Sequence, residues 1–230
     1  MRRPMDKDAP EPFQRERRPV DRRESLMALL GETLGERGFK LRKKDGAFAR
    51  KVESGDVQTI HLSLIGRGDA DFDVTVALAI RLDPLERLLD ELSGADTGGS
   101  SSLGVDLGNL SVGRPRRWTI AADPDVPRAA ESIQECLDTV GQAYFDRFGR
   151  MPVVFRIMSG DGPASWLHSP FHATRAIKAV ALAHVLGEQD SVERLIEAKR
   201  CFLVARKDKD LDRFDTFVAQ LRKKTAAHRH

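Results

Sequence analysis

Cysteine, tryptophan, tyrosine and asparagine are scarce in this chain of 230 residues, which has two Cys, two Trp and one Tyr. Cys136 and Cys201 lie far apart, each at an apolar position of a helical pattern, so we expect two small buried hydrophobic residues rather than a disulfide or a reactive pair. A chain of this length can bury a core that needs neither disulfide nor metal. Arginine far outnumbers lysine and Asn109 stands alone, a bias that predicts a bacterial source with a GC-rich genome.

Long hydrophobic runs are also missing, which argues against a membrane-spanning helix. The start, Met1 to Asp6, is charged and no apolar segment follows it, so the pattern is not that of a secretory signal. Hydrophobic residues make up 40% and charged residues 32%, as is typical of soluble globular proteins. We therefore expect a cytoplasmic protein that does not contact a membrane.

Charge and composition divide the chain into three predicted parts. Residues 1–24 are rich in Arg, Asp, Glu and Pro and nearly free of apolar residues, which predicts a disordered charged tail. Residues 25–150 are predicted to form an α+β sheet domain, and residues 151–227 a C-terminal helical region docked on the same core. The formal net charge is +3, and the excess is largest in residues 151–230, with 14 Lys and Arg against 9 Asp and Glu.

Four strand-like runs with short polar turns predict an antiparallel meander; they are 39–43, 48–52, 57–65 and 72–82. Asp45-Gly46 predicts a two-residue hairpin turn, which would place Lys43 opposite Phe48. That register puts Phe39, Leu41, Phe48 and Val52 on the core face. The third and fourth runs alternate apolar and polar residues in the same way, so one face of the sheet is expected to be apolar throughout.

Helical patterns surround this meander. Helices are expected over about 21–37, 83–92, 126–148, 169–186 and 211–224, with a further helix starting at a capping box over 190–193. Residues 94–102 are expected to be a flexible connector, and 103–112 and 116–122 to be two further strands. The pattern over 151–159 fits a strand or a helix. The predicted fold class is α+β, with an antiparallel sheet, helices packed on one face and a C-terminal helical hairpin.

The common catalytic and metal patterns are incomplete in this sequence. His61, Ser63 and Asp73 have the residue types of a catalytic triad, but their strand spacing does not place the histidine between nucleophile and acid. His168 and His172 are four apart, but Pro170 lies between them, so we expect no metal site there. The glycine-rich stretches lack the lysine of a phosphate loop. We therefore expect no cofactor.

The best candidate binding surface is basic. The predicted register places Lys40, Arg42, Lys44 and Lys51 on the polar face of the sheet, and His61 lies on that face of the third strand. The set can serve to keep a sheet face solvated, or to bind an acidic protein partner. No aromatic residue is interleaved with these cations, which argues against nucleic-acid binding by base stacking.

The segments 38–42, 48–50, 60–63 and 72–76, followed by the Trp-bearing strand at Arg117–Ile120, resemble a bacterial family known only as domain-of-unknown-function family 4304. The resemblance extends over about residues 24–225 and implies an N-terminal helix, a meander and terminal helices, without an active-site pattern.

The leading functional hypothesis is a non-enzymatic protein-interaction module. The alternatives are an enzyme with a site between the sheet and the C-terminal helices, using His61, Arg175 or His172, and a weak nucleic-acid binder.

Overall fold

The structure is a computed structural model that describes residues 21–67, 71–93 and 101–227. The predicted tail lies almost wholly outside these residues, and so does most of the predicted connector over 94–102. The first helix, α1 (Arg22–Glu36), begins after Asp21, whose side chain accepts hydrogen bonds from the backbone N–H groups of Arg23 and Glu24. Gly38 follows with φ +79°, the left-handed conformation expected after a helix end.

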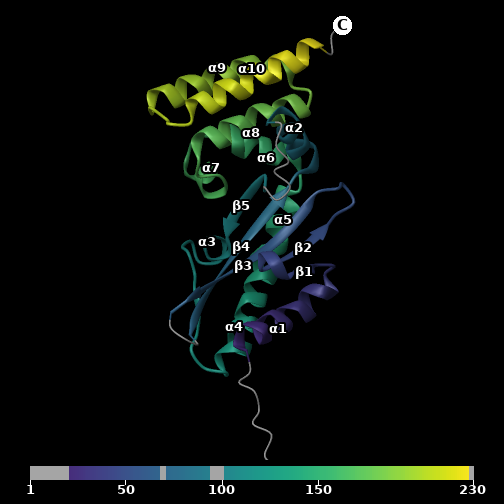
Figure 1. Ribbon diagram of the computed structural model, residues 1–230, viewed down its shortest axis with the longest axis vertical. Coiled ribbons are helices and arrows are strands. Elements are labelled where there is room, and N and C mark those ends of the chain that lie inside the picture. The colour runs from purple at the N-terminus through teal and green to yellow at the C-terminus, as the bar shows by residue number, and fades with distance from the viewer. Residues whose placement is uncertain (1–20, 68–70, 94–100, 228–230) are drawn as a thin grey trace, which may run out of the picture.

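An open antiparallel sheet of six strands forms the centre of the described residues (Figure 1). Its path is β1-β2-β3-β4-β5, and β6 pairs with β4 beside β5. The strands are β1 (Lys40–Arg42), β2 (Ala47–Lys51), β3 (Val57–Gly66), β4 (Phe72–Arg81), β5 (Leu103–Asp106) and β6 (Trp118–Ile120). The predicted α+β class and antiparallel meander are confirmed.

The β1–β2 hairpin differs from its predicted register by two residues. A short 3-10 turn, η1 (Lys43–Asp45), replaces the two-residue turn, and Leu41 rather than Lys43 pairs with Phe48. Gly46 follows the turn with φ +59°. Because side chains alternate with a period of two, the shift leaves Lys40 and Arg42 on the predicted face, but it moves Lys44 out of the strand and leaves Leu41 partly exposed.

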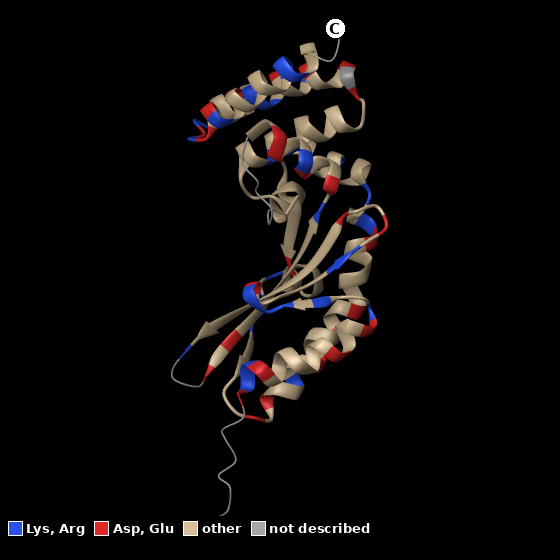
Figure 2. Cartoon of the chain, turned by 45° about the vertical axis from the view of Figure 1, so that its right-hand side comes forward, with Lys and Arg blue, Asp and Glu red and all other residues tan. Residues whose placement is uncertain are grey.

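Helices cover one face of the sheet (Figure 2). The apolar side chains of β4 that face them, from Phe72 to Ile80, are fully buried. The covering elements are α1, α4 (Asp125–Cys136) and α5 (Gln142–Phe148), and a π-helical turn, η2 (Leu137–Gly141), joins the last two into the single long helix that was predicted. Phe39 packs on Phe145 with ring centroids 5.9 Å apart. The opposite face, the open face, has residues 167–171 over part of it.

The predicted strand over 103–112 is half helix. Asp106 ends β5, and its Oδ1 accepts hydrogen bonds from the N–H groups of Gly108 (2.8 Å) and Asn109 (3.3 Å), which starts α3 (Leu107–Ser111). The side chain of one residue thus changes the backbone from extended to helical. Strand β6 is likewise shorter than the predicted 116–122.

Gly108 and Gly35 offer a matched pair of substitutions. A Cβ at Gly108 would lie 2.4 Å from the backbone N of Arg116, so we expect Gly108→Ala to lower the free energy of unfolding by about 2 kcal/mol or more. A Cβ at Gly35, in α1, meets nothing within 4 Å, so Gly35→Ala should raise it by about 0.5 kcal/mol through helix propensity. Urea denaturation measures both, and equal effects would contradict the close approach at Gly108.

The C-terminal helices lie together at one end of the sheet (Figure 1). They are α6 (Met151–Ser159), α7 (Pro163–His168), α8 (His172–Val185), α9 (Gln189–Ala205) and α10 (Leu211–Ala227), and α8 also packs on α2 (Asp83–Ser93).

The hairpin of α8 and α9 was expected, whereas α7 was not. Residues 151–159 are helical. The prediction of a capping box over 190–193 was wrong, because α9 starts after Glu188 and no side chain caps its N-terminus. Cys136 is buried as expected, but Cys201 is exposed.

Buried apolar side chains of the sheet, its covering helices and the C-terminal helices form a single cluster. In the described part of the chain no helix has the length and apolar character needed to cross a bilayer.

Candidate functional site

The open face of the sheet carries a floor of small side chains with cations at its β1 end. The observed register aligns Arg42, Ala47, His61, Ala77 and Asp106 in one row across the five strands of the main path. The next row contains Lys40, Ala49, Thr59, Ala79 and Gly104. Side chains of one row project to the same side, so a ligand could approach the backbone at the alanines and glycine while it meets cations over β1.

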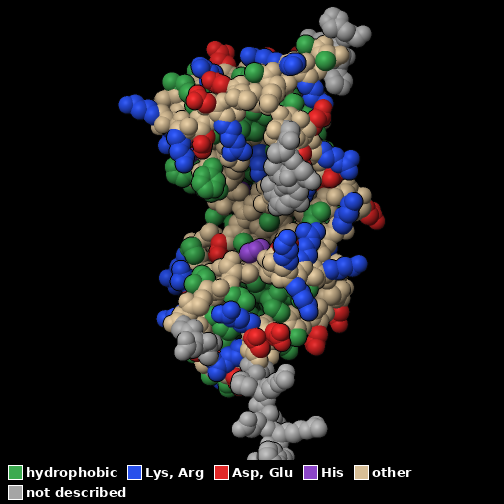
Figure 3. Space-filling view, in the orientation of Figure 1, with side chains coloured by type: hydrophobic (Ala, Val, Ile, Leu, Met, Phe, Trp, Pro, Cys, Tyr) green, Lys and Arg blue, Asp and Glu red, His purple; other side chains and the backbone are tan. Residues whose placement is uncertain are grey.

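A cavity of about 690 Å³ lies on this face, under the segment that joins α7 and α8. Its floor includes Thr59, His61, Ala77, Ala79 and Gly104, and Leu167, Phe171 and Thr174 lie on the opposite side. Figure 3 shows the hollow between the sheet and the C-terminal helices. We call this cavity the sheet-face groove.

Two of the five predicted binding residues, Arg42 and His61, line the groove. Lys40, Lys44 and Lys51 are exposed beside it and do not line it. Figure 3 shows Lys and Arg side chains gathered over the β1–β2 side of the hollow. The side chain of Arg42 has no hydrogen bond or ion pair with any residue that the structure describes, so its guanidinium group can bind an incoming anion.

The wall opposite the cations is apolar. Phe171 is 69% exposed and Leu167 40% exposed, and both line the groove. Large apolar side chains that stay exposed beside a cavity often mark a binding surface. Sequence reasoning missed this wall because α7 is too short for a detectable helical period, although the run of Trp166, Leu167 and Phe171 around Pro170 was visible.

His168 forms the buried corner of the same wall. Its side chain is only 8% exposed, and its ring packs on Tyr144 and Phe148 with centroids 5.7 and 4.5 Å apart. Nδ1 has no hydrogen-bond partner in the described structure. Burial, reinforced by the charge of Arg147, lowers the pKa of His168 to about 4, so the imidazole is neutral near pH 7.

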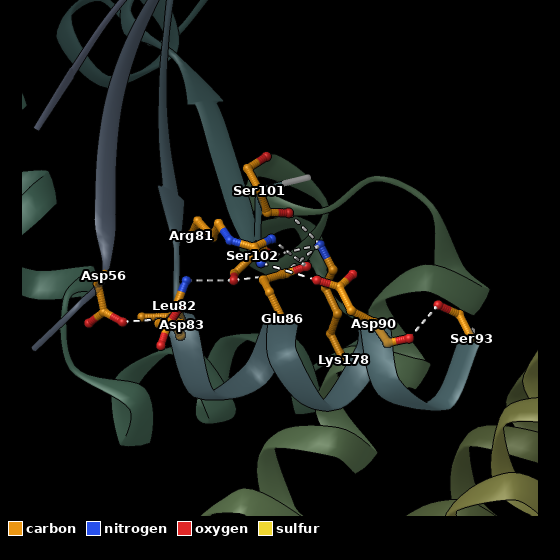
Figure 4. A network of polar contacts seen from close by, with 10 residues as sticks. All are labelled: Asp56, Arg81, Leu82, Asp83, Glu86, Asp90, Ser93, Ser101, Ser102 and Lys178. Atoms are coloured by element: carbon orange, nitrogen blue, oxygen red, sulfur yellow. Dashed lines mark hydrogen bonds and ion pairs between the residues drawn. The ribbon is translucent and has the colours of Figure 1, made fainter. Parts of the chain in front are cut away.

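A buried polar network supports the other end of the groove (Figure 4). Lys178, on α8, donates hydrogen bonds from Nζ to the backbone carbonyls of Ser101 (2.6 Å) and Ser102 (3.0 Å). The Ser102 hydroxyl donates to Glu86 Oε1 at 2.7 Å and accepts from the N–H of Leu82. Lys178 Nζ also lies 3.9 Å from Glu86, and Arg81 bridges Glu86 and Asp90.

Burial lowers the pKa of Lys178, while the carboxylate of Glu86 opposes that shift. Because Lys178, Ser101 and Ser102 all line the groove, this network holds the start of β5 in position against α8.

The structure does not bring the other predicted sets of residues together. Arg175, fully buried, donates to the backbone carbonyls of Gly160 and Ser169 and contacts His172 at 2.9 Å, and neither Arg175 nor His172 lines the groove. Only His61 of the three proposed enzyme residues therefore reaches this cavity.

The His61, Ser63 and Asp73 set is also divided. His61 Nδ1 lies 3.5 Å from Ser63 Oγ, but Asp73 pairs with Ile65 rather than with Ser63, and its Oδ1 accepts from Thr119 at 2.7 Å. His168 packs on Tyr144 and Phe148, whereas His172 packs on Trp166 and Phe202. Within the described ranges no three His, Cys, Asp or Glu residues could share a metal ion.

Comparison with known proteins does not identify a relative. No family model, curated protein or solved structure matches this chain. The resemblance to the uncharacterised bacterial family therefore stays a prediction.

Proposed function

We propose that this chain is a protein-interaction module whose sheet-face groove binds an acidic segment of a partner protein that also carries a large apolar side chain. The observation that carries the proposal is the division of the groove: cations over β1 on one side and an exposed Phe171 on the other, with small residues between. A partner segment would place carboxylates near Arg42 and an apolar side chain against Phe171 and Leu167.

The arrangement favours one orientation of that segment. Asp106 lies at the end of the row that starts with Arg42, and it would repel a carboxylate placed near β5. Arg81 and Lys178 are already paired with Glu86. The cations best placed to pair with a carboxylate of the partner are therefore Arg42 and its exposed neighbours Lys40 and Lys44.

The test measures binding of a fluorescein-labelled peptide of about ten residues, in which Glu and Asp alternate with Leu and Phe, to the full chain. We expect Lys40→Glu combined with Arg42→Glu to weaken binding about tenfold or more, because both changes put negative charge where the carboxylates would lie. Fluorescence anisotropy gives the affinity, which should also fall as salt is added.

Lys209→Glu combined with Lys223→Glu is the matched control, since both lysines are exposed, lie on the C-terminal helices or the turn before α10, and change the net charge equally. Ala79→Phe should block the groove while every cation is kept, because Ala79 lies on its floor. Equal affinity for the control pair and the Lys40 and Arg42 pair would refute the proposal, as would unchanged binding to Ala79→Phe that circular dichroism shows to be folded.

A further inference from the structure

A second cavity adjoins the sheet-face groove at α8. It has a volume of about 510 Å³ and is lined by α2, α8 and α10. Thr174 and Lys178 on α8 line both this cavity and the sheet-face groove. We call the second cavity the three-helix crevice.

Each of the three helices contributes one apolar side chain to the crevice. They are Leu89 from α2, Ile177 from α8 and Phe217 from α10; Ile177 and Phe217 are buried and Leu89 is partly buried. Three apolar side chains converging from different helices make a surface on which a short hydrocarbon chain can be desolvated.

The polar residues of the crevice carry more positive than negative charge. Among the described residues, Arg213 and Lys178 line it together with one carboxylate, that of Glu86. The carboxylate is committed to Ser102, Lys178 and Arg81. Arg213 donates one hydrogen bond, from Nη1 to Thr174 Oγ1 at 3.3 Å, and has no ion pair with any described residue.

The two cations also affect one another. The charge of Arg213 adds to burial in lowering the pKa of Lys178. An anion bound beside Arg213 would reduce this repulsion, whereas a cation would increase it. Arg213 has four further N–H donors in a planar group that suits a carboxylate.

We infer that the three-helix crevice is a binding site for a small amphipathic carboxylic acid, whose carboxylate pairs with Arg213 and whose hydrocarbon chain lies against Leu89, Ile177 and Phe217. This site adjoins the proposed peptide groove, with which it shares Thr174 and Lys178, but Arg213 and Leu89 line only the crevice. It would make the chain responsive to a small metabolite as well as to a protein partner.

The test uses octanoate as the probe, with octan-1-ol and octylammonium as matched ligands that keep the hydrocarbon chain and change the head group. Isothermal titration calorimetry on the full chain should show octanoate binding about tenfold more tightly than octan-1-ol, because a charge-assisted pair with Arg213 is added. Octylammonium should bind more weakly than either.

Three variants make the result specific. Arg213→Gln keeps a donor for Thr174 but removes the charge, so the affinity for octanoate should fall to that for octan-1-ol. Lys223→Gln, on the same helix, should leave the affinity for octanoate unchanged. Leu89→Phe should weaken octanoate and octan-1-ol alike, because it narrows the crevice. Absent binding, equal affinity of the two ligands, or octanoate binding that is lost in Arg42→Glu and kept in Arg213→Gln would overturn the inference. The last result would place octanoate in the sheet-face groove.

Discussion

Lys178→Met is expected to lower the free energy of unfolding by about 3 kcal/mol or more. The substitution keeps the length and apolar stem of the side chain but removes the ammonium group that bonds to the carbonyls of Ser101 and Ser102. It also leaves Glu86, whose side chain is only 1% exposed, with less positive charge nearby. Urea denaturation at pH 7 measures the loss, and Lys223→Met, at an exposed position of α10, is the matched control.

A second substitution separates the charge from the packing. Glu86→Gln keeps an oxygen that can accept the hydrogen bond of the Ser102 hydroxyl, but it removes the buried negative charge. Combined with Lys178→Met it should restore about 1–2 kcal/mol of the free energy of unfolding, because the buried carboxylate that lost one of its two cations is then neutral. Additive losses in the double variant would show that Lys178 acts only through its bonds to the backbone, and the charge argument would then be wrong.

Stability should fall between pH 6.5 and pH 4 because of His168. In the folded protein burial lowers the pKa of His168 to about 4, while in the unfolded chain it returns to its ordinary value near 6.5. The unfolded state therefore binds a proton first as the pH falls. That proton stabilises the unfolded state and so lowers the free energy of unfolding. The loss grows until the folded state also binds a proton near pH 4, where it reaches about 3 kcal/mol.

His168→Phe isolates this effect. Phenylalanine can pack on Tyr144 and Phe148, removes the Nδ1 atom that has no partner in the described structure, and does not titrate. Asp73 and Asp125, whose pKa values are lowered by hydrogen bonds, titrate in both proteins and so cancel in the difference. We expect the variant to lose about 3 kcal/mol less than the parent between pH 6.5 and pH 4. Parallel stability profiles would mean that His168 is solvated.

The arrangement of strands and their faces could be predicted from the sequence because alternation is a local property. The pattern from Phe72 to Ile80 places every second side chain on the covered face whatever the rest of the chain does. The same alternation explains why a hairpin register wrong by two residues still put Lys40 and Arg42 on the open face, where Arg42 and His61 line the groove. Long helices such as 126–148 were predictable because the helical spacing of apolar residues is also a local property.

Tertiary structure alone decided what faces these residues. The segment around α7 turns over the open face and supplies Phe171 and His168. The helix predicted from residue 169 starts at His172, so Phe171 lies just outside it. Lys178 donates a hydrogen bond to Ser101, 77 residues earlier in the chain. Arg213, on α10, donates one to Thr174, on α8. Such contacts depend on where whole helices pack, which follows from burial summed over many side chains rather than from local spacing. For that reason the sequence indicated one wall of the groove, while the apolar wall and the three-helix crevice appear only in the folded chain.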